Sequence, residues 1–134
     1  MIVVDTNIIS HLLVMSEQTS DAIKALEKDP IWFVPYLWRS EFCNVLTGCV
    51  RKKLLSRQDA KNILEHARQL LRGNEYSVSP SRVLELAVTS TCTAHDCEFI
   101  VLAQDLGVKL VTEDKQILAQ FPEIALALDK FVGI

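Results

Sequence analysis

Apolar and polar positions follow two different periods along the chain, and each period predicts one kind of element. Short stretches rich in β-branched and aromatic residues, bounded by turn-forming residues, are typical of buried strands. They occur at residues 1–5, 31–34, 76–78 and 107–111. Apolar residues spaced three and four positions apart predict helices between these stretches. The predicted helices cover residues 8–13, 21–28, 35–53, 56–71, 79–88 and 96–106.

This alternation of strands and helices predicts an α/β fold. Parallel neighbours in a sheet need long crossover connections, which the predicted helices would supply. We therefore expect a parallel sheet of about four to five strands flanked by helices. The length of 134 residues, without a linker or a repeat, predicts a single domain over residues 1–134.

Polar residues follow two of the predicted strands directly. Asp5-Thr6-Asn7 comes after the first strand, and Thr112-Glu113-Asp114 comes after the last. In parallel sheets the functional crevice lies beyond the carboxyl ends of the strands, so Asp5 and Asp114 would point into it. Each acid alone could simply be a helix N-cap, which is worth about 1 kcal/mol.

Two further acids, Glu41 and Asp96, lie near the starts of predicted helices within apolar sequence. Asp96 alone could be a helix N-cap, and Glu41 alone could be a first-turn acid that the helix dipole favours. Four carboxylates brought together would repel one another and take up protons unless a cation compensated them. Because Mg²⁺ and Mn²⁺ prefer oxygen ligands, the set predicts a site for one of these ions.

Charge and composition restrict the partners. The chain is 49% apolar and 23% charged, with a net charge of −3, so binding of nucleic acid would need metal ions or a local basic patch. Arg51, Lys52 and Lys53 form one such patch, which is either an RNA contact or a solvated helix end. Without an apparent export signal or membrane span, we expect a cytoplasmic protein with its four cysteines reduced.

Four aromatic residues lie close together around the second predicted strand. They are Trp32, Phe33, Tyr36 and Trp38. Aromatic residues of this kind are enriched in interfaces, and they are equally common in cores. The cluster therefore predicts either a dimer interface or ordinary core packing.

Three segments resemble those of a known family. The segments are VVDTNIISHLL, Arg39-Ser40-Glu41-Phe42 and HDCEFIVLAQDLGVKLVTED. They are similar to the PIN-domain ribonucleases, in particular to the VapC-type toxins of toxin–antitoxin pairs. The last segment is the most specific, because an acid, an aliphatic helix, Leu-Gly, a short strand and Thr-x-Asp follow in that order.

The resemblance implies a set of roles. Asp5, Glu41, Asp96 and Asp114 match the acidic quartet that coordinates Mg²⁺ or Mn²⁺. Thr6, Asn7 and Thr112 match polar positions that support the acids or metal-bound water. The family pattern also implies a homodimer, an antitoxin partner, and hydrolysis of single-stranded or loop RNA that leaves a 5′-phosphate. Cys97 stands where the family commonly has Ala, and Glu113 adds an acid whose role the sequence leaves open.

Two alternatives belong to other functional classes. A PIN-like module that binds RNA or protein without cleaving would usually have lost one of the four acids, and all four are present. A receiver-type signalling domain would need an acidic pair after the first strand and a phosphoacceptor Asp after a middle strand. The first strand leads to only one acid, and no middle strand ends in Asp.

Overall fold

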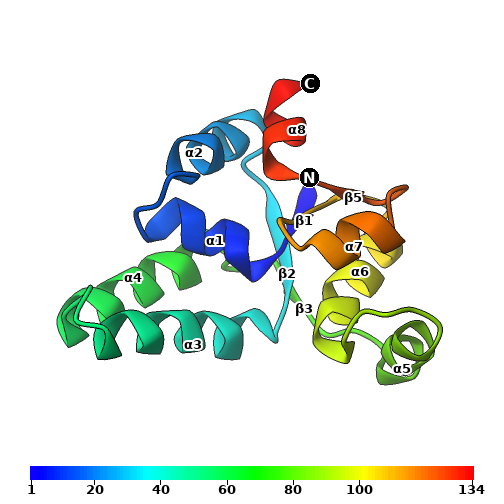
Figure 1. Ribbon diagram of the computed structural model, residues 1–134, viewed down its shortest axis with the longest axis horizontal. Helices are drawn as coiled ribbons and strands as arrows, with labels where there is room; N and C mark the ends of the chain where they lie inside the picture. Colours follow the sequence, from blue (N-terminus) through cyan, green and yellow to red (C-terminus); the bar gives the residue numbers. More distant parts are fainter.

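The computed structural model describes residues 1–134 and shows a parallel sheet between two groups of helices (Figure 1). The five strands are β1 (Ile2–Val4), β2 (Trp32–Pro35), β3 (Glu75–Tyr76), β4 (Leu110–Val111) and β5 (Ala125–Leu126). The helices are α1 (Thr6–Leu13), α2 (Thr19–Lys28), α3 (Trp38–Arg51), α4 (Arg57–Leu70), α5 (Pro80–Val88), α6 (Ala94–Leu106), α7 (Lys115–Gln120) and α8 (Leu128–Gly133). The predicted α/β class is confirmed.

The order of the strands places the candidate site. The sheet runs β3-β2-β1-β4-β5, and every neighbouring pair is parallel. Val3 of the central strand pairs with Phe33 on one side and with Leu110 on the other. The chain moves outward from β1 through β2 to β3, and later fills the other side with β4 and β5. The strand order therefore reverses between β1 and β4, where ligands bind in open α/β sheets.

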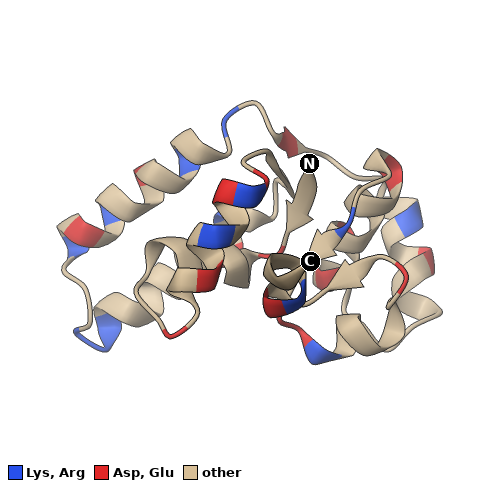
Figure 2. Ribbon diagram, turned by 90° about the horizontal axis from the view of Figure 1, so that it is seen from above, with Lys and Arg blue, Asp and Glu red and all other residues tan.

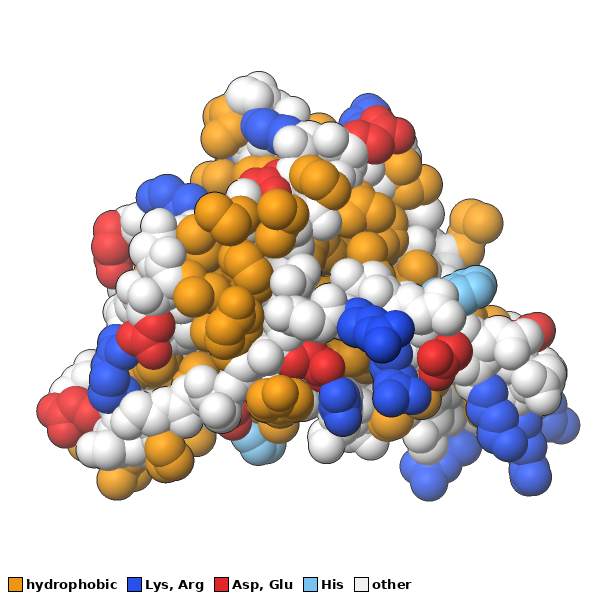
Figure 3. All heavy atoms as spheres, turned by 180° about the vertical axis from the view of Figure 1, so that it is seen from behind, with side chains coloured by type: hydrophobic (Ala, Val, Ile, Leu, Met, Phe, Trp, Pro, Cys, Tyr) orange, Lys and Arg blue, Asp and Glu red, His pale blue; other side chains and the backbone are white.

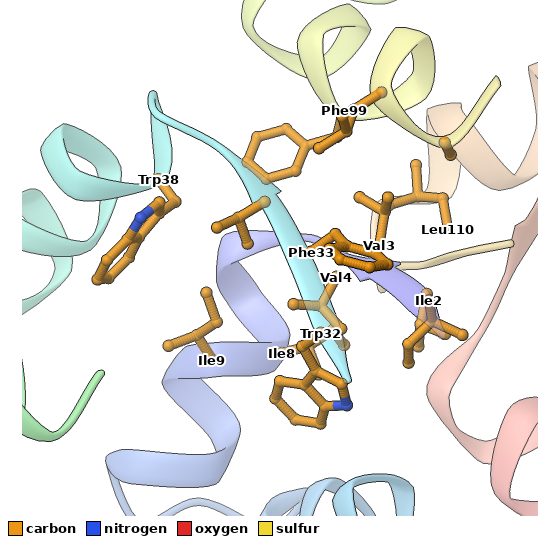
Figure 4. Close-up of a cluster of buried hydrophobic side chains, with 14 of the residues drawn as sticks. Ile2, Val3, Val4, Ile8, Ile9, Trp32, Phe33, Trp38, Phe99 and Leu110 are labelled. Atoms are coloured by element: carbon orange, nitrogen blue, oxygen red, sulfur yellow. The ribbon is translucent and has the colours of Figure 1, made fainter. Parts of the chain in front are cut away.

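Apolar side chains fill both faces of the sheet. Helix α6 crosses β1, β2 and β4, and α5 packs against its outer side. Figure 4 shows Phe99 of α6 on one side of β2, and Ile8 and Ile9 of α1 on the other. Because α6 lies between the sheet and α5, it is apolar on most of its circumference, as expected of a buried helix.

Several predicted helix boundaries needed correction, two of them at the starts of helices that carry candidate site acids. The helix predicted over 35–53 begins at Trp38, because Pro35 still belongs to β2 and the next two residues form a turn. The helix predicted from 96 begins at Ala94, because Thr93 is its N-cap. The helix that an N-cap at Asp114 implies is α7, whereas β5 and α8, which follow it, were not predicted from the sequence.

Helix α8 is tied to α2 by one lysine. The ammonium of Lys28 donates to the carbonyl oxygens of Phe131 and Ile134, both at 2.6 Å. It also lies 4.7 Å from the centre of the Phe131 ring. A cation favours the carbonyl end of a helix, so this contact stabilises the last turn of the chain.

The aromatic cluster was predicted to be either an interface or part of the core. In the structure it divides into three core residues and one exposed residue. Trp32 and Trp38 are fully buried and Phe33 is nearly so, which makes all three part of the core. The interface interpretation is therefore wrong for these three residues. Tyr36 differs from them, because 51% of its surface is exposed.

None of the eight helices combines the length and the apolar character needed to span a bilayer.

Candidate active site

A cleft of about 440 Å³ lies beyond the carboxyl ends of the strands. Of the residues singled out from the sequence, six line it: Asp5, Thr6, Asn7, Glu41, Asp96 and Asp114. These residues come from α3, α6 and the segments that follow β1 and β4. The parallel sheet thus brings together four acids that lie as much as 109 positions apart in the sequence, between Asp5 and Asp114.

Three of the acids also cap their own helices. The Asp5 carboxylate accepts from the Thr6 amide at 2.8 Å, and Asp114 accepts from the Ile117 amide at 3.0 Å. Both are N-caps, as the cap interpretation predicted. Asp96 is not an N-cap, because it is the third residue of α6 and shares a capping box with Thr93. Capping and cleft lining therefore occur together in these residues.

Two threonine hydroxyls connect the acids. Thr6 donates to Oε1 of Glu41 at 2.7 Å, and Thr112 donates to Oδ2 of Asp5 at 2.7 Å. The Thr112 hydroxyl also accepts from the Asp114 amide at 3.0 Å, and its side chain is fully buried below the cleft. These bonds restrict the rotamers of Asp5 and Glu41. The Thr112 bond links the ends of β1 and β4, and the Thr6 bond links α1 to α3.

The cleft has a strongly negative character. Burial raises the pKa of Asp5 from 3.8 to about 6, and the negative charges of Glu41 and Asp96 add to this effect. Hydrogen bonds from Thr112 and Thr6 to the Asp5 carboxylate act in the opposite direction. No Lys or Arg is among the residues that line the cleft. A cation from outside the chain would therefore be favoured here.

The donors in the cleft suit a hard divalent ion. Four carboxylates and the amide of Asn7 supply oxygen atoms, which Mg²⁺ and Mn²⁺ prefer. The Asn7 Oδ1 atom is buried and accepts no hydrogen bond within the chain, which is costly unless a water or a ligand donates to it. As they stand, no three acidic, His or Cys side chains are grouped closely enough to hold one ion. Binding would therefore require side chains to turn inward.

Four cleft residues were missed by sequence analysis. They are Ser10, His11, Asn44 and Val45. Ser10 and His11 follow Asn7 by three and four positions on α1, and Asn44 and Val45 follow Glu41 by the same spacing on α3. Side chains three and four positions apart share one face of a helix, so this spacing was the signal that could have found them.

Other predicted residues lie outside the cleft. Arg51, Lys52 and Lys53 are exposed at the end of α3, where α3 and α4 form a hairpin that projects from the sheet. Figure 2 shows this basic tip at the left, away from the strand ends. Glu113 does not line the cleft. All four cysteines are free thiols, and Cys97 is buried at the start of α6.

Comparison with known proteins identifies the family. The sequence model of the PIN domain matches residues 2–124 of this chain. The chain belongs to the PIN domain family. This PIN domain is 29% identical to ribonuclease VapC3 of Pyrobaculum aerophilum over 126 residues, which cover 92% of this chain and 96% of that protein. The family assignment confirms the resemblance and rules against the receiver-type alternative.

Solved structures share the fold of this PIN domain. PAE2754 of Pyrobaculum aerophilum superposes with a TM-score of 0.79 at 20% identity, covering 98% of this chain and 93% of its own. A toxin–antitoxin complex of Klebsiella pneumoniae contains a chain with a TM-score of 0.70 at 19% identity, covering 96% and 98%. These scores confirm the predicted PIN-like architecture over nearly the whole chain.

Proposed function

We propose that this PIN domain is a metal-dependent endoribonuclease that hydrolyses single-stranded or loop regions of RNA, and that it is the toxin of a type II toxin–antitoxin module. The observation that carries the nuclease proposal is the convergence of four carboxylates, without a Lys or Arg, in one cleft at the switch of strand order. The similarity to ribonuclease VapC3 supports the same reaction.

Asp5, Glu41, Asp96 and Asp114 would hold Mg²⁺ or Mn²⁺. When bound, such an ion supplies an activated water for attack on phosphorus and neutralises charge on the leaving oxygen. Thr6 and Thr112 act as positioning residues, because their hydroxyls hold the Glu41 and Asp5 carboxylates in place. Asn7 offers its unpartnered Oδ1 atom to a water or hydroxyl proton in the cleft.

The carboxylates repel phosphates, so affinity for RNA must come from elsewhere on the surface. Arg51, Lys52 and Lys53 at the end of α3 would contribute by contacting phosphates outside the cleft. Such contacts are weakened by salt, because each one releases counterions from the RNA.

The function is tested by incubating purified protein with total cellular RNA and Mg²⁺ or Mn²⁺, followed by mapping of the new ends. We expect cleavage that stops in EDTA and in the Asp96→Asn variant, with 5′-phosphate ends. Cleavage that persists in EDTA, or 5′-hydroxyl ends, would contradict the metal mechanism. Absence of cleavage with every RNA would favour the alternative of a PIN-like module that binds RNA or protein without cutting.

The proposed toxin would act with two protein partners. An antitoxin is suggested by the toxin–antitoxin complex among the structural neighbours, and it could neutralise the acids by inserting an arginine.

A homodimer is supported by the broad apolar area on the face shown in Figure 3, since monomers rarely expose large apolar patches. Sedimentation at micromolar concentration should show twice the monomer mass, and a single monomeric species would contradict the dimer.

A further inference from the structure

A second pocket lies on the other side of the beginning of α3. Its volume is about 310 Å³, and its lining contains no apolar residue. The six lining residues come from the start of α3, the end of α4 and β3: Arg39, Glu65, Arg68, Gln69, Arg72 and Glu75. On the face shown in Figure 3, basic and acidic side chains lie side by side along the lower part of the molecule. With three arginines against two glutamates, the pocket has an excess of positive charge.

Arg39 is held in a fixed position within this pocket. Its Nε atom donates to Oε2 of Glu75 at 2.6 Å, and its Nη2 atom donates to Oε1 at 2.8 Å. The indole of Trp38 also donates to Glu75, at 2.7 Å. Glu75 is therefore fully engaged, and its pKa is lowered chiefly by the hydrogen bonds from Arg39. The Nη1 end of Arg39 makes no hydrogen bond within the chain and remains available as a donor.

The other two arginines are free to bind a ligand. Arg68 makes only one contact, to Glu65 at 3.2 Å, and both side chains are more than half exposed. An exposed pair of this kind is weak and can exchange its partner for another anion. Arg72 is exposed, and its side chain has no hydrogen bond or ion pair within the chain. The pocket thus presents more N–H donors than the protein itself satisfies, which suits a phosphate group.

An exposed aromatic ring lies beside the arginines. The guanidinium of Arg39 is 5.5 Å from the centre of the Tyr36 ring, and 51% of the Tyr36 surface is exposed. Tyr36 precedes the first turn of α3, which carries both Arg39 and Glu41. At 3.6 residues per turn, these two residues point to opposite sides of the helix. The arginine pocket and the acidic cleft therefore flank the same helix start, with Tyr36 at its end.

We propose that Tyr36, Arg68 and Arg72 form a subsite for a single-stranded RNA segment that flanks the bond to be cleaved. Tyr36 stacks on a base, and the two arginines, beside the fixed Arg39, bind phosphate. Arginines combined with exposed aromatic rings are how proteins bind single-stranded nucleic acid. This inference rests on the proposed function, because an acidic cleft that cleaves RNA needs a cationic site nearby to hold it.

The test measures binding of a fluorescent single-stranded oligoribonucleotide over a range of salt concentrations, in the cleavage-impaired Asp96→Asn background. We expect Arg72→Gln to weaken binding and to lower the slope of log affinity against log salt by about 0.7, the value for one phosphate contact in a single strand. Lys24→Gln removes the same charge from an exposed position on α2 and should leave the slope unchanged. An unchanged slope in Arg72→Gln would overturn the phosphate assignment.

Tyr36 is tested by a matched pair of substitutions. Tyr36→Leu should weaken binding roughly 5- to 150-fold, the range for loss of one base–aromatic stack, whereas Tyr36→Phe keeps the ring and should bind like the parent. Equal affinity in the Leu and Phe variants would overturn the stacking role. If an acidic peptide, but no RNA, binds in a manner sensitive to Arg72, the site is a protein-binding site and the proposal is wrong.

Binding is measured without cleavage, so failure of the two proposals can be distinguished. If the protein cleaves no RNA but its binding of the oligonucleotide still depends on Arg72 and Tyr36, the subsite proposal stands and the nuclease proposal fails. In an active protein, Arg72→Gln should raise KM for long RNA with little change in kcat. A change in kcat alone would contradict a role in holding the RNA.

Discussion

Asp5→Asn is expected to lower the rate of RNA cleavage roughly a thousandfold and, at the same time, to stabilise the metal-free protein at neutral pH. The loss of rate follows because a bound ion contributes several kcal/mol to a transition state of this kind, and each 1.36 kcal/mol is tenfold in rate. The gain in stability follows from the pKa of Asp5, which burial and the neighbouring acids raise to about 6.

The sign of the stability effect depends on pH. Folded Asp5 keeps its proton up to about pH 6, whereas the unfolded chain releases it near the ordinary value of 3.8. The folded state is therefore favoured fully below that value, and this contribution is lost as pH rises to 6. The shift in the pKa of Asp5 corresponds to about 3 kcal/mol. Replacing the carboxylate by the amide of Asn removes one hydrogen bond, which costs about 1 kcal/mol. Asp5→Asn should gain about 2 kcal/mol at pH 7 and lose about 1 kcal/mol below pH 4, where the pKa shift no longer contributes.

Denaturant unfolding at pH 4 and pH 7 measures this effect, and Thr112→Val is the comparison variant. It removes the 2.7 Å bond to Asp5, so the pKa of Asp5 should rise further and unfolding at pH 7 should become easier by roughly 1–3 kcal/mol. Two substitutions at the same contact thus have opposite signs at pH 7. Destabilisation by Asp5→Asn at pH 7 would show that burial of the ionised Asp5 carboxylate does not lower the stability of the folded protein.

Millimolar Mn²⁺ is expected to raise the melting temperature of the wild type by roughly 10 °C. An ion present at a hundred times its dissociation constant adds about 2.7 kcal/mol to the free energy of unfolding, and a chain of this size gains about 4 °C per kcal/mol. The physical source is relief of repulsion among the four carboxylates of the cleft. Thermal melts with and without the ion measure the shift.

Two variants decide whether the ion binds in the cleft. Asp114→Asn removes a proposed ligand and should abolish most of the shift. Glu113→Gln removes the adjacent acid, which does not line the cleft, and should keep the shift. A wild-type melting temperature that does not respond to Mn²⁺, or an equal loss in both variants, would refute the proposed ligand set.

The end of the chain shows why part of the fold could not be predicted from sequence. Strand β5 covers only Ala125–Leu126 and is followed directly by α8, within a stretch that reads IALALDK. Alanine and leucine in such a short run fit a buried strand and a buried helix equally well. Pairing of β5 with β4 decides the strand, and the contact of Lys28 with the last turn of α8 stabilises the helix.

Tyr36 and Trp38 show the same limit for surface residues. Both are aromatic and lie two positions apart at the start of α3, yet Trp38 is fully buried and Tyr36 is half exposed. The indole of Trp38 has a partner in Glu75, which lies 37 positions further along the chain. A partner so distant leaves no local pattern, so the arginine pocket around Glu75 was not predicted.

The sequence by itself determined the α/β class, the parallel sheet and the four acids, because these depend on local periods and on residues that directly follow strands or begin helices. Only the tertiary structure decided that Thr6 holds Glu41 and that Thr112 holds Asp5, since each bond joins segments that the sheet brings together. It also decided the raised pKa of Asp5, because burial and neighbouring charge exist only after the strand ends have assembled.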